Sequence, residues 1–262
     1  MIVAFDIGNT ETTVGLFDAD RVHAHWRLTT NVPRTPDEYR LLLANLLGGA
    51  GVAPSYIVGS AICSVVPPVT GIIEEACIAL FGASPIHIDA RANLPVRLDV
   101  EEPLSVGADR IANTLAASMI YRRDTIVVDL GTATTYDCIT ATGAFLGGVI
   151  QPGVVTSAET LFRRAAQLAA TELVPPSHVI GRRTEDCIRS GVIFGAADSI
   201  DGIVRRIIAE WGVADPLVLA TGGLAAILEP ICETFDKVDP FLTLQGVRLG
   251  YELLAERPHR TA

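Results

Sequence analysis

Two stretches of the chain, residues 2–13 and 125–135, combine a carboxylate, a glycine and hydroxyl side chains in the same order. In each, an apolar run ends in an acid, Asp6 or Asp129, and a glycine follows two residues later. Apolar β-branched residues predict a buried strand, and glycine allows the chain to leave it in a tight turn. The hydroxyl groups then lie beside exposed backbone N–H groups. Such a turn suits a phosphate group or its cation.

The two stretches predict an internal duplication. They align without a gap at five pairs of positions: Asp6 with Asp129, Gly8 with Gly131, Asn9 with Thr132, Thr12 with Thr135, and Leu16 with Ile139. A unit used twice predicts two similar halves that face each other across a cleft. A strand followed by Asp and Gly is common in α/β proteins, so one copy alone would say little. Two copies with matched polarity favour a pair of phosphate-binding loops.

A third carboxylate lies in the stretch Val106–Asn113, where Asp109 and Arg110 precede a helix expected over residues 111–121. The positive end of a helix dipole stabilises a carboxylate and attracts anions. An ordinary charged first turn with a surface ion pair is an equally good interpretation of these two residues.

Glycine-rich segments mark two further places where the backbone can approach a ligand. Gly147–Gly153 contains three glycines, which are costly unless the chain must bend or come close to something. A bulge with a bend is the alternative. The expected strand at Leu217–Gly223 ends in a glycine turn, where a nucleotide could lie.

Composition excludes several classes of protein. The 262 residues carry a formal net charge of −10, so nucleic acid is not an expected partner. Lys237 is the only lysine, and it does not follow a glycine loop. A P-loop and the protein-kinase fold each need a phosphate-binding lysine, so both are excluded.

The five cysteines form no C-x-x-C pair, and with the five histidines they show no zinc-ligand spacing. We expect free thiols in a reducing compartment. The apolar segment after Met1 stops at Asp6, so we expect a strand there and no signal peptide. No run approaches the roughly 20 apolar residues of a membrane span, and we expect a cytoplasmic protein.

The expected elements of the first half have the order βββαβαβ, which is that of a ribonuclease-H-like domain. Thr35–Glu38 has the cap, proline and acids of a helix start. In the second half, strands are expected from residues 125, 135 and 144. Helices are expected over 157–170 and 244–256, and a long helix is expected to open with residues 181–186 and to run to about residue 211. The sequence thus predicts an α/β protein with two duplicated ribonuclease-H-like domains, residues 1–117 and 118–262, facing across a nucleotide cleft.

At this point the motifs resemble a known group. The duplicated Asp-x-Gly turns with Thr221–Gly223 are similar to the phosphate and adenosine motifs of the acetate-and-sugar-kinase/actin ATPase superfamily. More narrowly, four ordered stretches resemble the type III pantothenate kinases: Asp6–Thr10, Gly107–Arg110, Asp129–Thr135 and Gly147–Gly153. The resemblance runs nearly end to end, although Val100, Glu102 and Ala169 depart from residues common in the family.

The resemblance implies phosphorylation of pantothenate to 4'-phosphopantothenate by ATP with Mg²⁺, the first step of coenzyme A biosynthesis, by a homodimer. It implies that Asp109 is the general base and that substrate is bound by Gly107, Ala108, Asp109, Arg110 and Thr184. It implies nucleotide contacts from Asp6, Ile7, Gly8, Asn9, Thr10, Glu11, Thr12, Thr13 and Thr132. Asp6 would hold the magnesium ion and Asp129 a monovalent cation, K⁺ or NH₄⁺.

Two other functions remain open on the sequence. A kinase or phosphatase of the same superfamily acting on another small molecule would share Asp6 and Asp129 but would not need residues 107–110. A non-catalytic accessory protein related to these kinases would have lost catalytic residues, whereas Asp6, Asp109 and Asp129 are all present.

Overall fold

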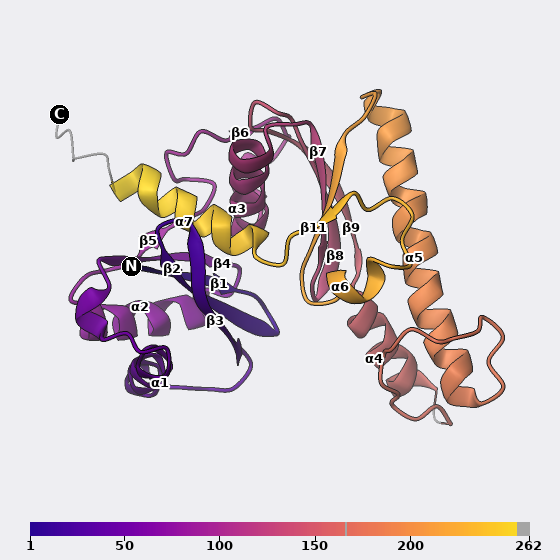
Figure 1. Ribbon diagram of the computed structural model, residues 1–262, viewed down its shortest axis with the longest axis horizontal. Helices are drawn as coiled ribbons and strands as arrows, with labels where there is room; N and C mark the ends of the chain where they lie inside the picture. The colour runs from indigo at the N-terminus through magenta and orange to yellow at the C-terminus, as the bar shows by residue number, and fades with distance from the viewer. Residues whose placement is uncertain (166, 256–262) are drawn as a thin grey trace. The chain divides into compact units, whose positions relative to one another are not determined.

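The computed structural model describes residues 1–165 and 167–255. The chain forms two compact units (Figure 1). The first comprises Met1–Ile120 and the chain from Leu242 onward, and the second comprises Tyr121–Phe241. The expected boundary after residue 117 lies close to the point between Ile120 and Tyr121 where the chain passes from the first unit to the second. The last helix, however, belongs to the first unit by its contacts. As a statement about duplicated domains, the division into residues 1–117 and 118–262 stays a prediction.

The first unit is built on a five-stranded sheet of order β3-β2-β1-β4-β5. Neighbours among β1, β2 and β3 run antiparallel, and β4 and β5 continue parallel to β1. The expected order βββαβαβ is therefore confirmed. The elements are β1 (Ile2–Ile7), β2 (Glu11–Asp18), β3 (Arg21–Thr29), α1 (Pro36–Gly49), η1 (Pro54–Tyr56), β4 (Gly59–Ser64), α2 (Pro67–Phe81), β5 (Ile86–His87), β6 (Arg97–Leu98), η2 (Pro103–Ser105), α3 (Ala108–Ala116), the π-helix Ala117–Tyr121 and α7 (Leu242–Ala255).

The second sheet has six strands in the order β11-β10-β7-β8-β9-β6, and the five strands that belong to the second unit, β11-β10-β7-β8-β9, repeat this arrangement. Its first three strands are again antiparallel neighbours, and the next two run parallel to the first. The α/β class with two ribonuclease-H-like units is thus confirmed by topology. The elements are β7 (Thr125–Leu130), β8 (Ala133–Ile139), β9 (Ala144–Pro152), α4 (Val154–Arg164), α5 (Thr184–Trp211), β10 (Leu217–Thr221), α6 (Ala225–Leu228) and β11 (Lys237–Val238).

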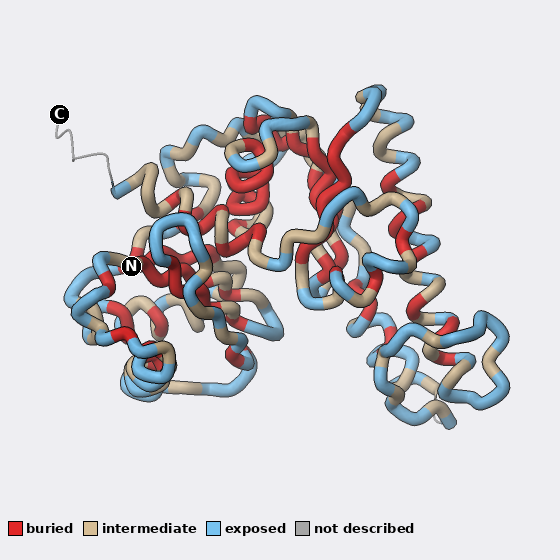
Figure 2. The backbone as a smooth tube through the Cα atoms, in the orientation of Figure 1, coloured by how far each residue is buried: buried red, intermediate tan, exposed pale blue. Residues whose placement is uncertain are grey.

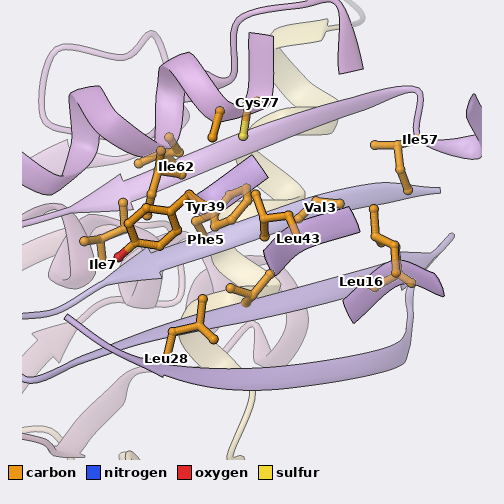
Figure 3. Packing of buried hydrophobic residues seen from close by; sticks show 14 of the residues in the cluster. Val3, Phe5, Ile7, Leu16, Leu28, Tyr39, Leu43, Ile57, Ile62 and Cys77 are labelled. Atoms are coloured by element: carbon orange, nitrogen blue, oxygen red, sulfur yellow. The ribbon is translucent and has the colours of Figure 1, made fainter. Parts of the chain in front are cut away.

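Buried strands form the centre of each unit (Figure 2). In the first, Phe5 and Ile62 of adjacent strands pack against Tyr39 and Leu43 of α1 (Figure 3). Helix α1 begins as expected with a capping box: Thr35 Oγ1 accepts from the Glu38 N–H at 3.3 Å, and Glu38 Oε2 accepts from the Thr35 N–H at 2.6 Å. Apolar burial and local capping both place this helix over the sheet.

Several expected helix bounds are wrong. The helix expected over 157–170 begins at Val154 and ends at Arg164. The alanines after residue 164 favour a helix by propensity alone, but among the described residues from 159 to 170 no side chain is buried to hold one in place. The helix expected over 111–121 starts at Ala108 and ends at Ala116, where a π-helix follows. Helix α7 begins at Leu242, and the expected end at Glu256 lies outside the described residues.

The cysteines Cys63, Cys77, Cys138, Cys187 and Cys232 are free, as expected. Burial raises the pKa of the Cys77 and Cys232 thiols to about 12. Among the described residues, no helix is long and apolar enough to cross a membrane.

Candidate active site

The first glycine loop, Gly8–Glu11, connects β1 to β2. Ile7 pairs with Thr12, so four residues form the turn. The Gly8 N–H donates to the Glu11 carbonyl at 3.0 Å, and the Thr30 N–H donates to the Thr10 carbonyl at the same distance. The hydroxyl groups of Thr12 and Thr30, both buried, lie 2.9 Å apart. The end of β3 therefore holds this loop.

The second glycine loop, Gly131–Ala133, connects β7 to β8. Leu130 pairs with Thr134, so only three residues form the turn. The Gly131 N–H donates to the Ala133 carbonyl at 3.1 Å. The alignment without a gap is consequently wrong beyond the turns by one residue. Thr12 corresponds to Thr134 rather than Thr135, and Leu16 corresponds to Cys138 rather than Ile139.

Two glycines pack closely on this part of the second sheet, Gly153 against the loop and Gly222 against the end of β7 just before it. A Cβ atom added at Gly153 would overlap the carbonyl oxygens of Gly131 and Thr132. Gly222 follows β10 with φ of +89°, and a Cβ atom there would lie 2.7 Å from Asp129 Oδ1. Glycine is required at both positions because the backbone approaches the loop directly. The Gly147–Gly153 stretch thus contains both features that the sequence left open, a bulge and a close approach of the backbone. Gly147 (φ +109°) lies in the bulge between β8 and β9, and Gly153 makes the close approach.

Asp109 and Arg110 lie in the first turn of α3, as the sequence predicts. Asp109 Oδ1 accepts the Arg110 N–H at 2.8 Å, so the carboxylate folds back over the helix start. A Cβ atom at Gly107 would lie 2.5 Å from the same oxygen. A residue larger than glycine at position 107 would therefore displace the carboxylate of Asp109.

Helix α7 supports α3 from the far end of the chain. The Thr243 hydroxyl donates to Asn113 Oδ1 at 2.8 Å, and both residues are buried. A side chain at Gly246 would overlap the backbone of Ala112. Close packing between the two helices therefore fixes the position from which Asp109 projects (Figure 1).

A cavity of about 570 Å³ lies beside this helix start, at the carboxyl ends of β4 and β5. Ligands of open α/β sheets bind at that edge. Val65 connects the cavity to the first glycine loop: its N–H donates to the Ile7 carbonyl at 3.1 Å, and its Cγ1 lies near Gly107. Polar and charged side chains also line it, including Ser64, Glu74, His87 and Arg91. The structure thus brings residues 6–13 and 107–110 to one edge of the first sheet.

Thr184 lies elsewhere, at the start of α5 in the second unit. It lines a hollow of about 640 Å³ between α4 and α5, whose other lining residues are mostly small or apolar. Gln151 and Ser199 form a polar pair there, with the Ser199 hydroxyl donating at 3.1 Å. Asp129 and Thr132 also lie in the second unit, so the predicted residues are divided between the two units.

The carboxylates of the site could take part in binding a cation with a phosphate. Among residues 1–165 and 167–255, no group of three or more Asp, Glu, His or Cys side chains could hold a metal ion. Mg²⁺ usually binds through one or two carboxylates together with the phosphates of its substrate. Asp6 at the end of β1 fits that mode, because the N–H groups and hydroxyls of the first loop follow it directly.

Comparison with known proteins identifies close relatives of the whole chain. A family model described as type III pantothenate kinase matches residues 2–206. A protein named type III pantothenate kinase from Roseiflexus castenholzii is 46% identical over 253 residues, covering 97% of this chain and 99% of the relative. Its near-complete coverage of both chains means that the similarity includes both units.

Solved structures share the fold at low sequence identity. A putative Baf family transcriptional activator from Campylobacter jejuni has a TM-score of 0.60 at 18% identity, covering 97% of this chain and 100% of that one. An activator of 2-hydroxyisocaproyl-CoA dehydratase from Clostridium difficile, with bound ADPNP, has a TM-score of 0.59 at 12% identity, covering 100% and 99%. At these identities the likeness establishes the fold alone.

Proposed function

The chain belongs to the type III pantothenate kinase family, and we propose which of its residues carry out the reaction. That reaction is ATP-dependent phosphorylation of pantothenate, the first step of coenzyme A biosynthesis. Asp109 accepts the proton of the acceptor hydroxyl as that oxygen bonds to the γ-phosphorus, and the bond from this phosphorus to the β,γ-bridging oxygen breaks to release ADP. The observation that carries this assignment is that Gly107 and Ala108, just before Asp109, line a cavity whose Val65 donates its N–H to the carbonyl of Ile7, next to Asp6. A carboxylate near a developing alkoxide is the usual base in phosphoryl transfer to an alcohol.

The same helix start would bind the other end of the acceptor. Pantothenate is a carboxylate, and the first-turn N–H groups of α3 together with the Arg110 guanidinium provide positive potential. Gly107 and Ala108 line the cavity and leave room for the ligand there. We therefore assign Gly107, Ala108, Asp109 and Arg110 to pantothenate.

The nucleotide would be bound by both glycine loops. Asp6, Ile7, Gly8, Asn9, Thr10, Glu11, Thr12 and Thr13 would bind the triphosphate, and Thr132 would add a contact from the second loop. Lys237, the only lysine, lies with its ammonium 4.8 Å from the centroid of the Tyr121 ring. Backbone N–H groups and hydroxyls must then do the work that lysine does in other kinases. Mg²⁺, held by Asp6, would neutralise phosphate charge, and Asp129 would hold K⁺ or NH₄⁺.

We further propose a cytoplasmic homodimer. Apolar side chains are exposed around α4 and the start of α5: Ile150, Val155, Leu161, Val179 and Ile180. Exposed apolar groups gathered near a hollow favour association. A second copy over this face would bring other groups to Thr184 and complete the part of the pantothenate site assigned to it.

The test is the rate of ADP release by the purified protein with pantothenate and with other small alcohols, each with and without K⁺. Asp109→Asn should lower kcat by about 10²- to 10⁴-fold, the usual contribution of a general base. ATP binding should persist, because the carboxylate is assigned to the acceptor. Asp37→Asn is the control, since Asp37 is an exposed carboxylate at the start of α1; it should retain the full rate.

Three outcomes would contradict the assignment. Near-normal turnover by Asp109→Asn would exclude Asp109 as the base. Faster turnover of another alcohol would indicate a different small-molecule kinase of the same superfamily. Absence of turnover with any alcohol would indicate a non-catalytic accessory protein.

A further inference from the structure

The carbonyl oxygen of Thr132, in the second glycine loop, accepts two hydrogen bonds from the start of α4. The Gly153 N–H donates to it at 3.1 Å, and the Thr156 hydroxyl donates at 2.7 Å. Gly153 is the residue before the helix and has no side chain to cap it. The N-terminal turn of α4 is therefore attached to the loop.

These two bonds fix the direction of one peptide unit. A peptide is planar and trans, so its C=O and N–H groups point in opposite directions. With the Thr132 oxygen held toward α4, the N–H of the same peptide, which belongs to Ala133, points away from that helix. The positive end of the helix dipole also favours a carbonyl oxygen in this position. The loop thus keeps one conformation through contacts on its side facing α4.

The hydroxyl of Thr156 is used differently from that of the next threonine on the helix. Threonine hydroxyls inside helices usually bond to the carbonyl of the preceding turn. Thr160 does this, donating to the Thr156 carbonyl at 2.8 Å. Thr156 instead donates to a residue 24 positions earlier in the chain. The Thr156 hydroxyl therefore bonds to the second glycine loop, whereas the Thr160 hydroxyl bonds within its own helix.

We propose that Thr156 is a positioning residue for nucleotide binding: its hydroxyl holds the second glycine loop in the conformation that binds ATP. This inference rests on the proposed function, in which Thr132 contacts the nucleotide. Thr156 itself need not touch ATP. Its removal should weaken ATP binding, while the part of the acceptor site at residues 107–110, in the other unit, keeps its own geometry.

The test compares three variants of the full chain. Thr156→Val keeps the shape of the side chain but removes the donor, Thr156→Ser keeps the donor, and Thr160→Val removes the hydroxyl one turn later. Thr156→Val should raise the KM for ATP and the dissociation constant of ATP by about 3- to 10-fold, the effect of one hydrogen bond. Thr156→Ser should restore values near those of the wild type, and Thr160→Val should not change them.

A purely structural role would give another pattern. It would lower the melting temperature and change the KM values for ATP and pantothenate together, which would overturn the proposal. Equal ATP dissociation constants for Thr156→Val and the wild type would also overturn it. Failure of the proposed function is separate: the wild type would then lack pantothenate-dependent turnover, while calorimetric titration with ATP would still test Thr156.

Discussion

The two glycine loops of this chain occupy equivalent places in their sheets but are supported in different ways. In both, the residue just after the third strand donates its N–H to a loop carbonyl: Thr30 to Thr10, and Gly153 to Thr132. In the first unit an irregular segment follows, and α1 begins only at Pro36. In the second, α4 begins at once and adds the Thr156 hydroxyl. The second loop is thus bonded to the first turn of the helix that follows its sheet strand, whereas in the first unit the helix begins six residues after Thr30.

The hydroxyl groups beneath the loops differ as well. Thr12 and Thr134 occupy equivalent buried positions, each opposite the last residue of the first strand. The Thr12 hydroxyl is paired with that of Thr30, whereas the Thr134 hydroxyl has no hydrogen-bond partner within the described part of the chain. Beside the backbone bond that both loops receive, the first loop is therefore supported by a pair of hydroxyls below it, and the second by the Thr156 hydroxyl from α4. The two units therefore share the position of the loop in the sheet but not its length or its support.

The largest effect that this comparison predicts is that of Gly153→Ala. The φ of −64° at Gly153 is open to any residue, so the cost is purely steric. The new methyl group would overlap the carbonyl oxygens of Gly131 and Thr132. We expect a loss of about 1–3 kcal/mol in the free energy of unfolding, typical of overpacking. We also expect ATP affinity to fall by more than about tenfold, because the displaced loop costs more than one hydrogen bond.

Gly202→Ala is the matched control for this substitution. Gly202 lies inside α5, and a Cβ atom there would meet nothing within 4 Å. Alanine should raise stability by about 0.5–1 kcal/mol, because it restricts the unfolded chain and suits a helix. Urea unfolding and calorimetric titration with ATP measure both quantities. If Gly153→Ala behaved like Gly202→Ala, the close approach of α4 to the loop would be refuted.

The next effect concerns the two buried threonines. Thr12→Val should destabilise the protein by about 1–3 kcal/mol, because it leaves the buried Thr30 hydroxyl without its partner. Thr134→Val should instead stabilise it by about 1 kcal/mol, since it removes a buried hydroxyl that has no partner. Urea unfolding without nucleotide measures both changes. Destabilisation by Thr134→Val as large as that by Thr12→Val would show that an ordered water molecule or ligand binds the Thr134 hydroxyl.

Much of this comparison could be predicted from the sequence. The β-branched runs before Asp6 and Asp129 predicted the central strands, and their similarity predicted the repeated topology. The position of Asp109 in the first turn of a helix also followed from sequence. These are local properties, because they depend on residues that adjoin one another in the chain.

The sequence could not show the different lengths of the two loops. The residues align well without a gap, and only the strand pairing reveals that one loop has an extra residue. Side-chain types do not settle which turn a short polar loop forms, whereas the ladder of hydrogen bonds does. The packing of α7 on the first unit was also missed, since Gly246 packs on Ala112 of α3 across a long sequence separation.

Thr156 was missed for a related reason. A threonine in the first turn of a helix is ordinary, and nothing in its spacing points to residue 132. The available signal was Gly153: a glycine next to Pro152, just before a helix, indicates that another backbone comes close. Which backbone comes close depends on the pairing of β8 with β9, and sequence alone does not give that register.

A smaller predicted effect distinguishes the start of α1 from the start of α4. Thr35→Ala removes the hydroxyl that caps α1 and should cost about 1 kcal/mol of stability. It should leave ATP affinity unchanged, because α1 does not contact a glycine loop through its cap, whereas Thr156→Val should do the reverse. A change in ATP affinity with Thr35→Ala would show that the first loop also depends on its helix.

The contribution of the capping box to the free energy of unfolding should depend on pH, and the direction of that dependence follows from the pKa of Glu38. The Thr35 N–H and hydroxyl lower the pKa of Glu38 from its ordinary value of 4.5. A carboxyl group with a lowered pKa in the folded state adds stability above its unfolded pKa, and this is lost as the pH falls through the folded value. The free energy of unfolding, measured with urea, should therefore be slightly higher for the wild type than for Glu38→Gln at neutral pH. The two values should converge in acid, and the difference is small because the group is exposed. A difference that grew on acidification would mean that Glu38 does not cap α1 as a carboxylate.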